Sequence, residues 1–135
     1  MTLGARIRRI TRLELERTIR ILIVDDEPAV CRAIAQVLNA QGHEVLTALS
    51  GEEALALIER SRLDAVFLDI AMPGMNGIEV LRRIRQSDSR LPVIILSGWA
   101  NQEEIELARE LGATDVVFKP AALRHLSDAL ARLAR

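Results

Sequence analysis

Residues 65–74 read Ala-Val-Phe-Leu-Asp-Ile-Ala-Met-Pro-Gly, an apolar run that ends at Asp69 and passes into a Pro-Gly turn. A short, unbroken apolar run of this kind is typical of a β-strand that is covered on both faces. A carboxylate that directly ends such a strand lies at the edge of a sheet, where ligands bind in open α/β folds. Asp69 is therefore the first candidate for a functional residue.

Two further apolar runs end in charged residues in the same manner. Residues 21–24 lead into Asp25 and Asp26, and residues 117–118 lead into Lys119. Three carboxylates and a lysine are therefore expected at one edge of a sheet, which suits a divalent cation beside a phosphoryl group. Lys119 is the only lysine in a chain with 17 arginines, which argues against the alternative that it is an ordinary solvated side chain.

Short β-branched runs alternate with helical periodicities along the chain from residue 20 onward. Strands are predicted over five ranges: 20–24, 43–48, 65–69, 92–97 and 115–118. Apolar residues at three- and four-residue spacing follow each range and indicate a helix. Ser50, Asn76 and Asn101, each with a glutamate three residues later, mark helix starts. The pattern predicts an α/β fold, a doubly wound parallel sheet of five strands with five surrounding helices.

Length and charge limit the class of protein. The 135 residues are enough for one domain, and half of them are hydrophobic. Residues 1–20 hold six arginines against two glutamates, but the remainder has 12 basic and 17 acidic side chains, which argues against direct binding of nucleic acid. The sequence contains neither an apolar stretch long enough to span a membrane nor a secretory signal. We therefore expect a cytoplasmic protein without a membrane partner.

Two of the candidate residues have a structural alternative that the sequence leaves open. Ser97 ends the predicted strand 92–97, where its hydroxyl either donates to a phosphoryl group or simply terminates the strand. Asp26 either contributes to the charged edge or caps the helix that begins near Pro28, because aspartate is a preferred N-cap residue.

Four segments together resemble the receiver domain of two-component response regulators. They are residues 21–27 (Ile-Leu-Ile-Val-Asp-Asp-Glu), 67–77 (Phe-Leu-Asp-Ile-Ala-Met-Pro-Gly-Met-Asn-Gly), 94–98 (Ile-Ile-Leu-Ser-Gly) and 112–120 (Gly-Ala-Thr-Asp-Val-Val-Phe-Lys-Pro). The resemblance covers residues 19–135 and implies the flavodoxin-like strand order 2-1-3-4-5. It leaves residues 1–18 as a basic N-terminal extension with helical spacing of its apolar residues, either a solvated terminus or a docking or dimer-forming helix.

The resemblance implies that Asp69 accepts a phosphoryl group from a sensor histidine kinase or a histidine phosphotransfer protein, with Mg²⁺ as the cofactor. The metal ligands that it implies are Asp25 (through a water), Asp26, Asp69 and the backbone carbonyl of Ala71. Lys119 and Ser97 would hold the phosphoryl group. The chain would assist its own phosphorylation and dephosphorylation without being an enzyme for other substrates. A downstream effector would bind the helix that starts near Asn101, the strand 115–118 and the last helix, and a homodimer is a further expectation.

Two competing functions are weaker but remain open. One is a pseudo-receiver, a protein-binding module that does not accept phosphate, although such chains usually lose an acid or the lysine. The other is a phosphatase that forms an aspartyl phosphate, which needs a second acid two residues after the nucleophile, where this chain has Ala71. The chain also departs from the family at Val116, where an aromatic residue is usual, and Phe118 is the candidate substitute on the same face of the strand.

Overall fold

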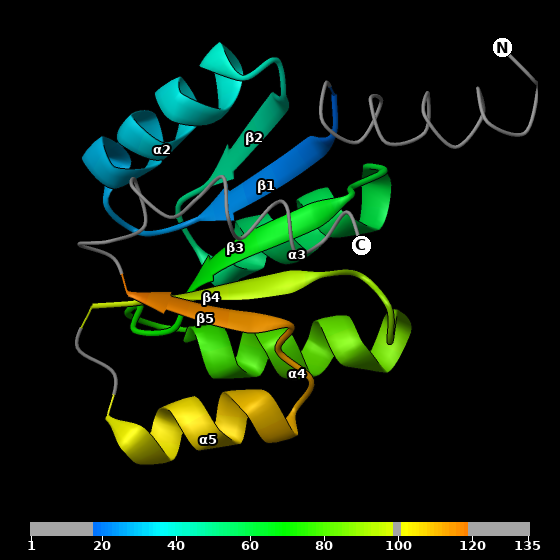
Figure 1. Ribbon diagram of the computed structural model, residues 1–135. Helices are drawn as coiled ribbons and strands as arrows, with labels where there is room; N and C mark the ends of the chain where they lie inside the picture. Colours follow the sequence, from blue (N-terminus) through cyan, green and yellow to red (C-terminus); the bar gives the residue numbers. More distant parts are fainter. Residues whose placement is uncertain (1–17, 99–100, 119–135) are drawn as a thin grey trace, which may run out of the picture.

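The sheet organises the part of the chain that the computed structural model describes, residues 18–98 and 101–118 (Figure 1). Five parallel strands lie in the order β2-β1-β3-β4-β5, which confirms the predicted fold class and strand order. Their bounds are β1 (Arg20–Val24), β2 (Glu44–Ala48), β3 (Ala65–Asp69), β4 (Val93–Ser97) and β5 (Asp115–Phe118). Strands β2 and β4 each begin one residue later than predicted.

Four helices connect the described strands, labelled here as in Figure 1. They are α2 (Pro28–Ala40), α3 (Gly51–Arg60), α4 (Gly77–Ser87) and α5 (Gln102–Glu110). Within the described ranges, none of these helices is long and apolar enough to cross a membrane. The predicted last helix and residues 1–17 of the predicted extension lie outside the described residues.

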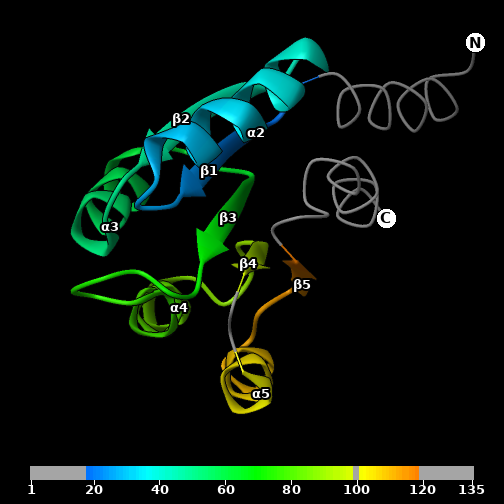
Figure 2. The ribbon, with the colours of Figure 1, turned by 90° about the vertical axis from the view of Figure 1, so that its left-hand side faces the viewer.

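Strand alternation divides the core into two layers, one on each face of the sheet. In β1, Leu22 and Val24 pack in the layer that contains residues of α3, α4 and α5. Ile21 and Ile23 pack instead in the layer that contains residues of α2. Figure 2 shows the same division, with α2 on one side of the sheet and α4 and α5 on the other. The three central strands, β1, β3 and β4, are therefore buried on both faces, as their apolar sequences predict.

All three predicted N-caps are present, although they differ in detail. In each, the side-chain oxygen accepts a hydrogen bond of 2.8–3.1 Å from the N–H of the glutamate three residues later: Ser50 in α3, Asn76 in α4 and Asn101 in α5. A full capping box forms at Asn101, whose own N–H donates to the Glu104 carboxylate. These caps fix where α4 and α5 begin, on the side of the sheet where the strands end.

Candidate functional site

The carboxyl ends of three neighbouring strands bring Asp25, Asp69 and Ser97 to one edge of the sheet. Strands β1 and β3 pair in register up to Val24 and Leu68, so Asp25 and Asp69 are the next residues on adjacent strands. Ser97 ends β4, which pairs with β3 on its other side. All three are buried, with Asp25 0% and Asp69 2% exposed. Burial of two carboxylates side by side calls for compensation by hydrogen bonds or by cations.

The turn after β3 holds the Asp69 carboxylate in place. Its Oδ1 accepts a hydrogen bond of 3.0 Å from the N–H of Ala71, two residues along the turn. Ile70 donates to the Leu96 carbonyl at 3.2 Å, and Gly77 donates to the Ile70 carbonyl at 3.2 Å. The orientation of the Asp69 carboxylate is therefore set by the N–H of Ala71, and backbone bonds to β4 and to α4 hold the turn at Ile70.

Gly77 allows the start of α4 to lie directly against the backbone of Asp69. A Cβ at this position would overlap the Asp69 carbonyl oxygen and would lie 2.6 Å from the Cα of Ile70. A larger residue would consequently displace the turn that carries the Asp69 carboxylate. The sequence signal for this role was the Asn-Gly pair that ends the segment 67–77, although periodicity alone does not reveal the close contact.

A group of three carboxylates lies beside this edge, after β1. Among the described residues, oxygens of Asp25, Asp26 and Glu27 all lie within 4.8 Å of one another, whereas Asp69 is not part of this group. The N–H of Glu27 donates to Asp25 Oδ1 at 2.9 Å. The N-cap position of α2 is Glu27, without a side-chain cap, so the structure does not support the alternative in which Asp26 is the cap. Glu27 is the member of this group that the sequence prediction missed.

Ser97 places a buried hydroxyl at the same edge. Among the described residues its Oγ has no hydrogen-bond partner, and a buried polar group left in that state costs about 1–3 kcal/mol. The hydroxyl can donate a hydrogen bond to an acceptor that binds at this edge. Lys119, the remaining predicted site residue, lies outside the described residues.

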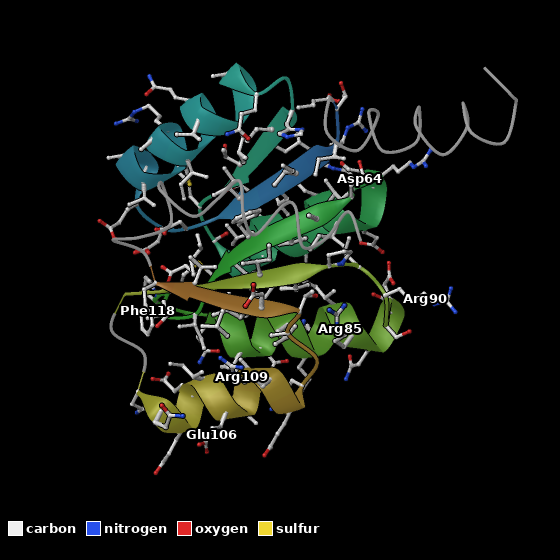
Figure 3. The ribbon with its side chains drawn as sticks, viewed as in Figure 1. Asp64, Arg85, Arg90, Glu106, Arg109 and Phe118 are labelled. Atoms are coloured by element: carbon white, nitrogen blue, oxygen red, sulfur yellow. The ribbon has the colours of Figure 1, made fainter. Side chains whose placement is uncertain are left out.

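Strand β5 has an exposed aromatic side chain at its end. Phe118 pairs in register with Ser97 and is 58% exposed, and Figure 3 shows it at the tip of the strand. Val116 pairs with Ile95 two residues earlier and packs against the core layer of α3, α4 and α5. The aromatic residue of this face is therefore at the end of the strand, and the usual aromatic position holds an aliphatic side chain.

The strand order agrees with what comparisons with known proteins show. The chain belongs to the family of response regulator receiver domains, whose sequence profile matches residues 21–131. It is 41% identical over 106 residues to the transcriptional regulatory protein AfsQ1 of Streptomyces coelicolor, a match that covers 78% of this chain and 47% of that protein. It is 35% identical over 111 residues to sporulation initiation phosphotransferase F of Bacillus subtilis, with 82% of this chain and 90% of that protein covered.

Solved structures agree with this assignment. A CheY-like response regulator receiver domain protein from Methanospirillum hungatei superposes with a TM-score of 0.83 at 31% identity, over 87% of this chain and 94% of that one. The receiver domain of the Francisella response regulator 1452 gives a TM-score of 0.79 at 28% identity, over 86% and 96% of the two chains. The chain spans about half the length of AfsQ1 and most of the length of the phosphotransferase.

Proposed function

We propose that this chain is a phosphoacceptor in two-component signalling, and that Asp69 receives the phosphoryl group. The observation that carries the proposal is a buried, oriented carboxylate at the carboxyl edge of the sheet, in a chain that belongs to the receiver family. The donor is the phosphohistidine of a sensor histidine kinase or a histidine phosphotransfer protein. A bond forms between an Asp69 oxygen and phosphorus, the phosphorus–nitrogen bond breaks, and the leaving imidazole takes up a proton.

The protein's part in this transfer is positioning and charge neutralisation, which do most of the work in phosphoryl transfer. The N–H of Ala71 fixes one oxygen of Asp69, so that the carboxylate does not have to be ordered when the donor arrives. The Ser97 hydroxyl donates to a phosphoryl oxygen and thereby satisfies its own buried group. Lys119, next in the chain after Phe118, neutralises the phosphoryl charge as a point cation.

The donor set at this edge fits Mg²⁺. The cation prefers oxygen ligands, and the carboxylates of Asp25, Asp26 and Glu27 supply oxygens within 4.8 Å of one another. Asp25 (through a water), Asp26, Asp69 and the carbonyl of Ala71 would hold the ion. When bound, Mg²⁺ supplies positive charge that offsets the repulsion between the acids and the incoming phosphoryl group.

The phosphorylated chain acts on other proteins and not on small substrates. A new phosphoryl group adds nearly two negative charges, which bias a two-state surface. We expect a downstream effector, or a second copy of this chain, to read the surface of α5, β5 and the segment that follows Lys119. The chain is not an enzyme beyond its own phosphorylation and dephosphorylation, it binds neither nucleic acid nor membrane directly, and it works in the cytoplasm with the kinase.

The proposal is tested by intact mass after incubation with acetyl phosphate, with and without Mg²⁺. The unaltered protein is expected to gain one phosphoryl group only when Mg²⁺ is present, and Asp69→Ala is expected to gain none. Asp64→Asn is the matched control, because Asp64 lies at the opposite end of β3 (Figure 3). Absence of an adduct in folded protein would favour the pseudo-receiver, and turnover of a phosphomonoester would favour the phosphatase.

A further inference from the structure

Arg85 links the ends of two helices. Its Nε and Nη2 donate to the carbonyl of Gly112 at 3.0 and 2.8 Å, and its Nη1 donates to the carbonyl of Asp88 at 3.1 Å. Asp88 is the C-cap of α4, and Gly112 follows Leu111, the C-cap of α5. Carbonyls at helix C-termini lack partners within their helix and carry partial negative charge. One guanidinium therefore bonds the C-cap residue of α4 and the glycine that follows the C-cap of α5; Figure 3 labels Arg85.

The shape of the chain at Gly112 is matched to this contact. Its φ of +100° lies in the left-handed region that glycine adopts without strain. A Cβ on Gly112 would lie 2.9 Å from Arg85 Nε and 3.3 Å from its Cδ. Glycine thus ends α5 and also leaves room for the arginine. Burial lowers the pKa of the Arg85 guanidinium, and partly desolvated hydrogen bonds of this kind are stronger than exposed ones.

Further hydrogen bonds fix the same connection to α5 itself and to one more element, β4. The N–H of Ala113 donates to the Ala108 carbonyl within α5 at 2.9 Å. The N–H of Thr114 donates to the Val93 carbonyl at 2.7 Å, and the N–H of Val93 donates to Thr114 Oγ1 at 3.0 Å. The C-terminal end of α5 is therefore tied to α4 by Arg85 and to the start of β4 by Thr114.

The N-terminal end of α5 is held differently. Within the described residues, the hydrogen bonds that the side chains at this end make stay inside the helix: Asn101 and Glu104 bond each other reciprocally, and Gln102 donates to Glu106. A self-contained cap moves with its helix and does not fix the helix to a neighbour. Ile105 is buried in this half of α5, and burial of an apolar side chain is non-directional.

We propose that Arg85 makes Gly112 a fixed pivot, so that α5 responds to the acceptor site by tilting about its C-terminal end. The inference rests on the proposed function, because the movement of α5 would begin when Ser97 binds the phosphoryl group. Ser97 lies four positions before Asn101 in the sequence. Displacement then grows from Arg109 toward Asn101. A protein partner that distinguishes the phosphorylated state contacts the N-terminal half of α5, and the half near Arg109 presents the same surface in both states.

The contact between Arg85 and Gly112 is tested in the unphosphorylated protein by measuring amide hydrogen exchange of Leu111, Gly112 and Ala113. Arg85→Gln is expected to speed exchange at these amides by roughly tenfold or more, since it removes charged hydrogen bonds from a partly buried site. Arg85→Lys keeps the charge but loses the two-pronged donor, so an intermediate rate is expected. Arg83→Gln is the matched control, because Arg83 lies on the same helix and binds the exposed Glu79. Unchanged exchange in Arg85→Gln would overturn the proposal.

The tilt is tested by backbone amide chemical shifts before and after phosphorylation with acetyl phosphate and Mg²⁺. Shift changes are expected to be concentrated over residues 101–106 in the unaltered protein and to spread over residues 109–113 in Arg85→Gln. Equal changes along the whole of α5 in the unaltered protein would overturn the pivot. Absence of an adduct would overturn the proposed function and the signal with it, while the exchange rates would still show whether Arg85 holds Gly112.

Discussion

Gly77 sets how closely the start of α4 packs against the backbone of Asp69. Replacing it by alanine puts a methyl group into the Asp69 carbonyl oxygen and next to the Ile70 Cα, so the backbone must move. We expect Gly77→Ala to lower the free energy of unfolding by about 1–3 kcal/mol, the usual cost of overpacking. Urea unfolding measures this loss.

Gly74 provides the control for this substitution in the same turn. It has a φ of +73° and open space around its Cβ position, and asparagine tolerates the left-handed conformation. Gly74→Asn is therefore expected to cost less than about 1 kcal/mol. A larger loss in Gly74→Asn than in Gly77→Ala would show that close packing at Asp69 is unimportant.

His43 gives the fold a dependence on pH at the opposite end of the sheet. The side chain is buried, its Nδ1 accepts a hydrogen bond of 3.2 Å from the N–H of Ile19, and burial lowers its pKa below the ordinary 6.5. The unfolded chain therefore takes up a proton at a higher pH than the folded protein does. The stabilisation by neutral His43 is fully present above pH 6.5 and is lost as the pH falls toward the lower pKa of the folded state.

This effect is measured by urea unfolding between about pH 7.5 and pH 5.5, above the range in which most carboxylates titrate. The free energy of unfolding is expected to fall on acidification with a slope of at most about 1.4 kcal/mol per pH unit, the limit for one proton. In His43→Gln, which keeps an acceptor for Ile19 but does not titrate, the slope should be reduced. The same slope in both proteins would mean that another group is responsible.

The starts of the helices α2 and α5 differ in how their first N–H groups are satisfied. Asn101 caps α5 with its side chain, but α2 begins after Glu27 without a side-chain cap. Asn101→Ala is therefore expected to lower the free energy of unfolding by about 1 kcal/mol. Asp26→Ala, measured without Mg²⁺, should change it by less than about 0.5 kcal/mol, because it removes an acid from a like-charged group. Equal losses in the two variants would restore Asp26 as the cap of α2.

Helices and strands could be predicted from the sequence wherever the residues that specify them are close together in the chain. Short apolar and β-branched runs placed all five strands to within one residue. Strand β4 starts after Pro92 because proline has no N–H to pair. The capping box predicted at Ser50 is incomplete, because the Glu53 carboxylate accepts from the N–H of Leu49 and not from Ser50. Competition between partners of this kind is decided by three-dimensional geometry, which a spacing pattern does not contain.

Glu79 shows the same limit at the start of α4. Its carboxylate binds Arg82 and Arg83 at 2.8 and 3.1 Å and does not return to the N-cap. The hydrogen bonds from Arg83 and Arg82 lower the pKa of Glu79. The sequence predicts the cap, Asn76, but cannot decide between a carboxylate that completes the box and one that pairs with neighbouring arginines.

At the scale of the whole molecule, the site residues that the sequence could predict are those at the ends of the strands. Asp25, Asp69 and Ser97 were predictable because each ends an apolar run, and parallel strands end at one edge. The contact between Arg85 and Gly112 was not predictable, because it joins residues 27 positions apart through the packing of two helices. Glu27 was missed because an exposed acid after two others gives no separate signal.

The two ends of the strands have separate roles. The acids lie where the strands end, whereas Arg20 is fixed where β1 begins. Its N–H donates to Asp64 Oδ2 at 2.8 Å, and its side chain pairs with Glu44 at 3.0 Å. The chain therefore enters the sheet at the edge opposite Asp69.

The measurement that tests the account most directly is reductive trapping of the phosphorylated residue. After treatment with acetyl phosphate and Mg²⁺, borohydride converts an aspartyl phosphate into homoserine, and peptide mass spectrometry locates the converted position. The account predicts conversion at Asp69 alone, and none when Mg²⁺ is omitted. Conversion at Asp25, Asp26 or Glu27, or none at any position in folded protein, would contradict the assignment of Asp69 as the phosphoacceptor.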